Sequence, residues 1–195
     1  MENTLENYMI NATRTESLVD NIDERNSRVI HALMGLVTES GELIDALKRH
    51  YFYVKADKTR KPLDVVNLRE ECGDLMWYLA VLCDHYEKNF AETYYKCLHM
   101  ENVPKEVSDS RFLRRAMRMN ITAGKMLDNF ITMNEEPNIE EIFHNINYLV
   151  YELGGDWRDI TKSNIEKLKA RFPNAYNIDD ALNRDLNTER EILEK

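Results

Sequence analysis

The sequence is poor in the residues that form turns. Six glycines and four prolines make up about 5% of its 195 residues, whereas globular proteins average roughly 12%. A protein with many short β-strands needs many tight turns, so this shortage argues against an all-β fold. No segment alternates apolar and polar residues as a half-buried strand does. We therefore expect an all-α protein.

Positive charge is also in short supply. The chain has 26 Lys and Arg residues against 35 Asp and Glu, a net charge of −9. Binding to polymeric nucleic acid or to an anionic membrane needs clustered positive charge, so neither is an expected partner. Small phosphate compounds remain possible substrates, because a metal ion can lie between acidic protein groups and phosphate oxygens.

Long apolar runs and paired cysteines are absent. The longest apolar run, Leu75 to Cys83, is far shorter than the ~20 residues of a membrane span. The acidic N-terminal segment has no apolar signal-peptide core. Cys72, Cys83 and Cys97 form no Cys-x-x-Cys pair, which is typical of reduced thiols. These features predict a cytoplasmic protein.

The apolar periodicity predicts a bundle of helices in a single domain, 1–195. A marginal helix is expected within 1–25, and a largely buried one from about Arg28 to His50. A charged loop, Lys55 to Lys61, precedes a helix that starts near Asp64, passes Tyr86 and reaches Leu98 at most. Further helices are expected at 110–133, 139–153, 158–171 and 179–194.

Helix boundaries are marked by specific residues. Pro62 and Asp64 suit a helix start, and Asn138 with Glu141 resembles a capping box. Pro104 and the Ser108–Ser110 cluster predict a break, and Gly154-Gly155 and Pro173 predict helix ends. The domain is thus expected to contain a helical pair at 26–98, an inserted or degenerate second unit at 99–158 and C-terminal helices at 159–195.

A weak internal repeat is compatible with this division. The stretch from Ala32 to Thr38 can be laid over the stretch from Ala116 to Thr122, so that Glu39 falls on Ala123 and Glu42 on Met126. Either the chain is a tandem repeat whose second copy has lost its acids, or two amphipathic helices match by chance.

Two pairs of acids lie within the apolar helices. Glu39 and Glu42 are three residues apart, as are Glu71 and Asp74, so each pair lies on one helix face. Like charges repel and burial disfavours ionised groups, so a cation should offset them. Oxygen ligands from two facing helices suit Mg²⁺ or Mn²⁺.

The neighbouring residues agree with a binding site. Ala32, Gly35 and Ala46 lie on the same stripe as the first two acids, and we expect these small residues to leave room for a ligand. A single Glu-x-x-Glu pair is usually a solvated face, which is our interpretation of Glu191-x-x-Glu194. Two pairs in apolar, antiparallel helices are harder to explain in that way.

These motifs resemble those of the all-α, MazG-like nucleoside triphosphate pyrophosphohydrolases, which include dimeric dUTPases and phosphoribosyl-ATP pyrophosphohydrolases. Glu39-Ser-Gly-Glu42 and Glu71-Cys-Gly-Asp74 resemble the superfamily's Glu-x-x-Glu and Glu-x-x-Asp motifs. The segment 164–173 resembles its phosphate-contacting Lys-x-x-x-Arg segment. The long stretch between Asp74 and that segment departs from the usual pattern.

The resemblance implies Mg²⁺-dependent hydrolysis of a nucleoside triphosphate, by water attack at the α-phosphate, to a monophosphate and pyrophosphate. It assigns the metal, with Mn²⁺ as a substitute, to Glu39, Glu42, Glu71 and Asp74, and the phosphates to Lys167 and Arg171. Glu70 adjoins the cluster and either faces elsewhere or helps to position the water. A role in nucleotide-pool control or housecleaning and a homodimer or higher homo-oligomer are implied.

Other functions are less well supported. A non-catalytic nucleotide-sensing or interaction module of the same fold is the main alternative. A di-iron oxidoreductase would need a second Glu-x-x-His beside Glu141-x-x-His144, and the chain has none. His31 has no partner at zinc spacing. Trp77 and Tyr78 pack in the core or stack on a base, and Trp157 lines an entrance or caps the core.

Overall fold

The computed structural model describes residues 5–17, 26–53, 59–98 and 109–194. These ranges contain nine α-helices and no β-strand, which confirms the expected all-α class. Within the same ranges, no helix is both long and apolar enough to span a bilayer. The predicted breaks at Pro104 and Ser108, and the predicted loop from Lys55 to Lys58, lie outside the described residues.

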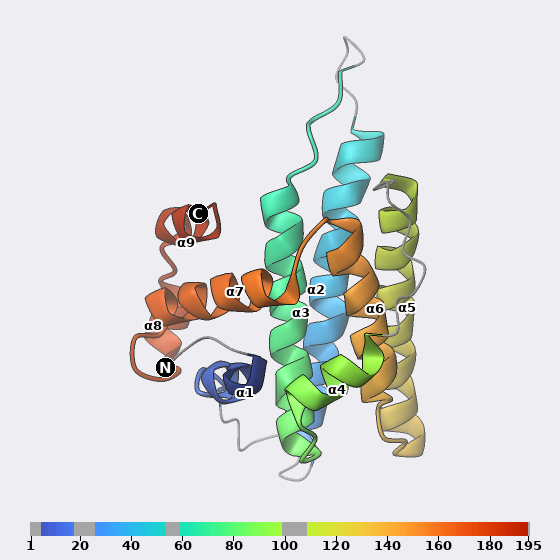
Figure 1. The fold of residues 1–195 in the computed structure, drawn as a ribbon, viewed down its shortest axis with the longest axis vertical. Helices are drawn as coiled ribbons and strands as arrows, with labels where there is room; N and C mark the ends of the chain where they lie inside the picture. Colours follow the sequence, from blue (N-terminus) through green and yellow to red (C-terminus); the bar gives the residue numbers. More distant parts are fainter. Residues whose placement is uncertain (1–4, 18–25, 54–58, 99–108, 195) are drawn as a thin grey trace.

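Four helices form a bundle (Figure 1). They are α2 (Ser27–Phe52), α3 (Val65–His85), α5 (Asp109–Met133) and α6 (Ile139–Glu152). Helix α2 packs against α3 and α5, and α6 also packs against α3 and α5. Leucines of α2 and α3 lie fully buried between them, as the apolar pattern predicts. The predicted helices at 28–50, 110–133 and 139–153 are confirmed to within two residues.

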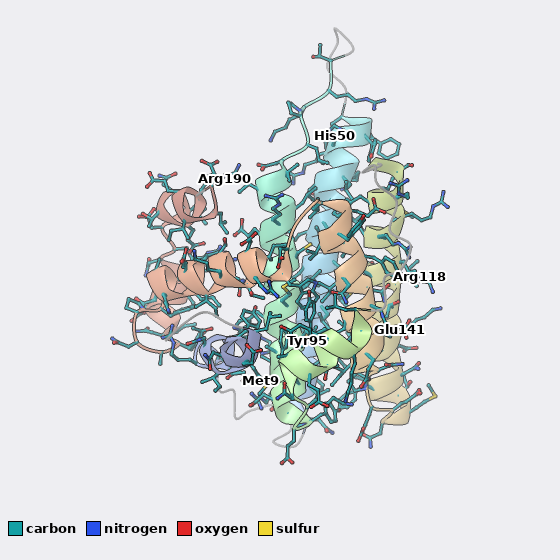
Figure 2. The ribbon with its side chains drawn as sticks, in the orientation of Figure 1. Met9, His50, Tyr95, Arg118, Glu141 and Arg190 are labelled. Atoms are coloured by element: carbon teal, nitrogen blue, oxygen red, sulfur yellow. The ribbon has the colours of Figure 1, made fainter. Side chains whose placement is uncertain are left out.

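The other five described helices lie outside this bundle, and α1, α7, α8 and α9 lie on its α3 side (Figure 1). They are α1 (Leu5–Thr13), α4 (Phe90–Cys97), α7 (Trp157–Arg171), α8 (Ile178–Leu182) and α9 (Leu186–Leu193). Helices α1 and α7 both pack on α3, and α9 packs on α7. Arg190 of α9, labelled in Figure 2, donates two hydrogen bonds of 3.0 Å to Asp64 and ties the C-terminal helix to the start of α3.

The predicted capping residues lie at the starts and ends of helices, as expected. The Asp64 side chain accepts a hydrogen bond from the Asn67 amide, and Asn138 accepts one from the Glu141 amide, both at 3.1 Å. Gly154 follows α6 with φ of +60°, the left-handed conformation that glycine adopts without strain. These local signals are sufficient to place three helix ends.

Two predicted helices are shorter than expected. The helix that begins after Asp64 ends at His85 and does not reach Leu98, because Glu87 turns the chain with φ of +52° and Asn89 caps the separate α4. The helix expected at 179–194 is divided into α8 and α9, because Asp185 accepts hydrogen bonds from the amides that begin α9. In the first 25 residues, helix is described only for Leu5–Thr13.

Candidate metal and nucleotide site

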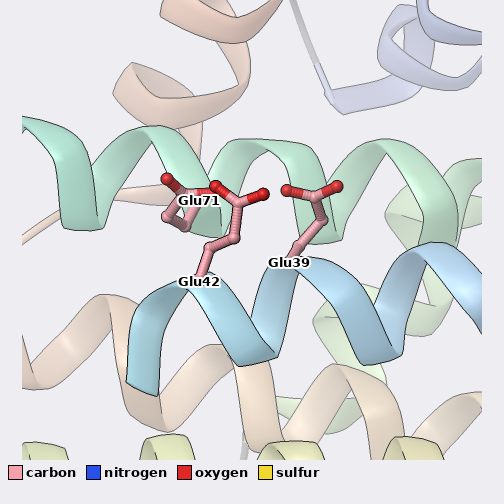
Figure 3. A group of neighbouring side chains, drawn as sticks. All are labelled: Glu39, Glu42 and Glu71. Carbon is pink, nitrogen blue, oxygen red and sulfur yellow. The ribbon is translucent and has the colours of Figure 1, made fainter. Parts of the chain in front are cut away.

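The two acidic motifs meet between α2 and α3. Glu39 and Glu42 project from α2 toward α3, where Glu71 lies (Figure 3). One carboxylate oxygen from each of these three residues lies within 4.8 Å of the other two. The three-residue spacing places the α2 acids on one face, and the packing of the two helices supplies the third. Three oxygens at this separation suit a hard divalent cation.

The electrostatics of this cluster also favour a cation. Burial is the main cause that raises the pKa of Glu39, followed by the charges of Asp74 and Glu42. Burial also raises the pKa of Glu71, again with contributions from those two acids. Asn67 donates a 3.0 Å hydrogen bond to Glu71 but brings no charge. A bound cation would therefore lower the cost of keeping these groups ionised.

Asp74 lies beside this cluster but is held by other groups. The Lys167 ammonium donates to both carboxylate oxygens of Asp74, at 2.7 and 2.6 Å. The side-chain amide of Asn164 donates to Oδ1 of Asp74 at 2.8 Å. Asp74 is therefore tethered to α7 on one side and exposed to a cavity on the other.

Lys167 is almost completely enclosed, with 1% of its surface exposed. It also donates a 3.2 Å hydrogen bond to Glu70, which therefore points toward α7 as well as lining the cavity. Burial alone would lower the pKa of Lys167, but the charges of Asp74 and Glu70 offset this and raise it. The ammonium thus stays charged behind Asp74, and Lys167 does not line the cavity.

Arg171 lines the cavity but is bound by a residue of the C-terminal helix. Its guanidinium donates to both oxygens of Glu189, at 2.8 and 2.6 Å. Arg184 donates to the same carboxylate at 2.7 Å. Burial would raise the pKa of Glu189, but the hydrogen bonds from the two arginines outweigh it and lower the pKa to about 2. Glu189 therefore holds two guanidinium groups at the cavity wall.

The cavity has a volume of about 540 Å³, within the range of small-molecule sites. Its lining includes the five acids from α2 and α3 together with Arg171 and Arg184. Aromatic rings complete the lining: His31, Trp77, Tyr78, Phe172 and Tyr176. The cavity therefore combines an acidic surface that could hold a metal ion, two guanidinium groups and aromatic surface.

The expectation that small residues leave room for a ligand is wrong at Gly35. A Cβ atom built there would lie 2.1 Å from the ring of Tyr78, so the ring of Tyr78 fills the space that the glycine leaves. Ala32 is fully buried in the core. Gly35 instead lets α2 approach the ring of Tyr78 on α3, which in turn lines the cavity.

The two tryptophans are largely buried, whereas His144 lies on the surface. The Trp77 indole donates to the Ala12 carbonyl at 2.9 Å and is 9% exposed, so it is tethered to α1 as well as lining the cavity. Trp157 stacks on Phe143 in the core, with ring centroids 5.6 Å apart, which supports the core-capping interpretation. His144 is exposed on α6.

The remaining acids and the thiols agree with the sequence. Glu191 and Glu194 are exposed, as expected for a solvated face. The three cysteines are buried and free. In the second unit, Ala123 and Met126 are buried where an internal repeat would match Glu39 and Glu42. The described residues of that unit therefore offer no matching acids, and the repeat remains a hypothesis.

Four residues that shape the site are not predicted from the sequence: Tyr8, Asn164, Arg184 and Glu189. None has a spacing that marks it out. Asn164 and Glu189 are buried polar residues on helices with polar surfaces, and each lies far along the chain from the acidic motifs.

A protein-family model matches the part of the chain that carries both acidic motifs. The family model of the MazG nucleotide pyrophosphohydrolase domain matches residues 29–98, which include α2, α3 and both acidic motifs. This match confirms the resemblance that those motifs predict. No curated protein and no solved structure matches the chain.

Proposed function

Taking the MazG nucleotide pyrophosphohydrolase domain at residues 29–98 as the premise, we propose that the protein hydrolyses a nucleoside triphosphate to the monophosphate and pyrophosphate. One observation carries this proposal. The carboxylates of Glu39, Glu42 and Glu71 converge at a cavity that Arg171 and Arg184 also line. Acids for a divalent cation and guanidinium groups in the same cavity suit a substrate with several phosphates.

Each group has a proposed role. Glu39, Glu42 and Glu71, with Asp74 beside them, would hold Mg²⁺ or Mn²⁺, which when bound neutralises phosphate oxygens and makes a water more acidic. Arg171 and Arg184 would bind the phosphates, because a guanidinium can contact two phosphate oxygens at once. Glu70 also lines the cavity and would accept a hydrogen bond from the attacking water.

Aromatic surface in the same cavity suits the nucleoside. Tyr78 and His31 face each other edge to face at 5.6 Å, and both line the cavity. Such rings can stack on a base and exclude water from the reacting phosphate. The choice of base and sugar depends on this part of the cavity, and a role in nucleotide-pool control or housecleaning remains part of the proposal. So do a homo-oligomeric assembly and a cytoplasmic location.

The test is pyrophosphate release from a panel of standard and modified nucleoside and deoxynucleoside triphosphates, with Mg²⁺, with Mn²⁺ and with EDTA. We expect metal-dependent release that is abolished in Glu39→Gln, Glu42→Ala and Asp74→Asn. Glu191→Gln is the matched control, since this exposed acid does not line the cavity and its replacement should leave turnover unchanged.

Two results would contradict the proposal. Undiminished turnover in Glu39→Gln and Asp74→Asn would remove the proposed site. Nucleotide binding without release of pyrophosphate from any nucleotide would favour the alternative, a nucleotide-sensing module of the same fold. In addition, Arg171→Ala should raise KM for the nucleotide more than it lowers kcat, because its proposed contact is with bound phosphate.

A further inference from the structure

A chain of buried hydrogen bonds connects α1 to the acidic surface of the cavity. The Tyr8 hydroxyl of α1 donates to Oδ1 of Asn164 on α7 at 2.9 Å. The Asn164 amide nitrogen then donates to Oδ1 of Asp74 at 2.8 Å. Tyr8 and Asn164 are each 2% exposed. Three helices thus meet at one carboxylate through two polar side chains shielded from water.

The Asn164 amide is held between the Tyr8 hydroxyl and the Asp74 carboxylate. An amide side chain has an acceptor end and a donor end, and it can turn over to exchange them. The Asp74 carboxylate can only accept, so the nitrogen of Asn164 faces it and the oxygen faces α1, where the Tyr8 hydroxyl donates to it. Without this donor, the buried oxygen of Asn164 would lose its partner, and the amide would lose the contact that holds it beside Asp74.

The backbone is adapted to this contact. A Cβ atom at position 73 would lie 3.2 Å from both Cβ and Nδ2 of Asn164, tighter than ordinary contacts. Glycine at 73 therefore lets Asn164 approach the α3 backbone, next to Asp74. The Tyr8 hydroxyl also lies 3.4 Å from the Gly73 carbonyl. Gly73 thus lies in contact with both side chains of the link, Tyr8 from α1 and Asn164 from α7.

Lys167 completes the restraint from the same helix. Its ammonium binds both oxygens of Asp74, so the carboxylate can rotate little without losing a charged hydrogen bond. Asn164 and Lys167 are three residues apart and lie on one face of α7. The side chain of Asp74 is still 25% exposed, toward the cavity.

We propose that Tyr8, Asn164 and Lys167 are positioning residues that hold the Asp74 carboxylate in one orientation toward the cavity. This inference rests on the proposed function, because it gives Asp74 a task that needs a defined geometry. It also gives Lys167 a role behind Asp74 instead of a contact with phosphate. Buried groups that orient a metal-binding carboxylate usually affect metal affinity or activity about tenfold or more when removed.

The experiment is a double-mutant cycle between Tyr8→Phe and Asp74→Asn. Tyr8→Phe keeps the ring that packs 5.1 Å from the ring of Phe90 and removes only the hydroxyl. Mn²⁺ affinity is measured without nucleotide by calorimetry, and kcat and KM are measured by pyrophosphate release. Tyr94→Phe, a partly buried tyrosine on α4, is the matched control. Asn164→Ala is a second probe of the same link.

We expect Tyr8→Phe to weaken Mn²⁺ binding and lower kcat, each about tenfold, with little change in KM. The Asp74→Asn background is expected to have no turnover, so the cycle is read there from Mn²⁺ affinity alone. In that background Tyr8→Phe should change the Mn²⁺ affinity less than twofold, because the carboxylate it orients is gone. Tyr94→Phe should match the wild type. If Asn164→Ala does not fold, the milder Tyr8→Phe still decides the question.

Two outcomes would overturn the inference while leaving the proposed function intact. One is wild-type behaviour of Tyr8→Phe. The other is an equal loss in both backgrounds, which would mean that the hydroxyl only stabilises packing. A wild-type protein that neither binds Mn²⁺ nor releases pyrophosphate would instead overturn the proposed function, and this inference with it.

Discussion

Replacing Glu71 by Gln tests whether the acidic cluster destabilises the fold when no cation offsets its charge. Glu71 is 6% exposed, and burial, with the charges of Asp74 and Glu42, raises its pKa from 4.5 to about 9. The folded protein therefore binds this proton more tightly than the unfolded chain does. Glutamine keeps the shape and can still accept the hydrogen bond from Asn67, but it carries no charge.

The direction of the pH effect follows from the raised pKa. Ionisation of Glu71 costs little at pH 5, close to the unfolded pKa, and the cost grows as the pH rises toward the folded pKa. At about 1.4 kcal/mol for each pKa unit, the upper bound at pH 8 is about 5 kcal/mol. Because nearby carboxylates share the proton and the side chain relaxes, we expect Glu71→Gln to raise the free energy of unfolding by about 1–3 kcal/mol at pH 8.

Thermal unfolding in EDTA at pH 5 and pH 8 measures this effect. The variant should melt about 3–10 °C above the wild type at pH 8 and close to it at pH 5. With saturating Mg²⁺ the order should reverse, because a bound cation stabilises only the protein that retains its ligands. Glu191→Gln, on the exposed face of α9, is the control and should not alter either curve. A gain that is equal at both pH values, or a loss at pH 8, would refute the reasoning.

The remaining predictions concern the cavity walls and the packing beneath them. Arg184→Ala should raise KM for the nucleotide about tenfold with a smaller change in kcat, and steady-state kinetics that match the wild type would remove this residue from the phosphate site. Gly35→Ala should lower the free energy of unfolding by about 1–3 kcal/mol in chemical denaturation, because the new Cβ overlaps the ring of Tyr78. Its control, Gly124→Ala, has open space around the new atom and should raise stability by up to about 1 kcal/mol; equal effects at both glycines would contradict the steric argument. Glu189, whose pKa is lowered to about 2, stabilises the fold above the unfolded pKa and loses this contribution as the pH falls toward 2. Glu189→Gln should therefore lower the melting temperature at pH 7 and make little difference near pH 2. An unchanged melting temperature at pH 7 would contradict a stabilising effect of the ion pairs between Glu189 and the two arginines.

Local patterns in the sequence determined the helical class and the acidic cluster. Some signals act only over a few neighbouring residues, namely the apolar period of a helix and the capping residues Asp64 and Asn138. Such signals can be recognised in the sequence without knowledge of the tertiary structure. The same holds for Glu39 and Glu42, because two residues three apart on a helix share a face wherever that helix packs. The convergence with Glu71 required only that α2 and α3 be antiparallel neighbours.

Only the tertiary structure decided what the basic residues contact. Lys167 and Arg171 lie one turn apart in the sequence, yet one is enclosed by Asp74 and the other is bound by Glu189 of the C-terminal helix. The hydroxyl of Tyr8 meets Asn164 across 156 residues of chain. Such contacts depend on how α1, α7 and α9 pack around α3, and packing sums many weak interactions over the whole molecule, so no local spacing records them.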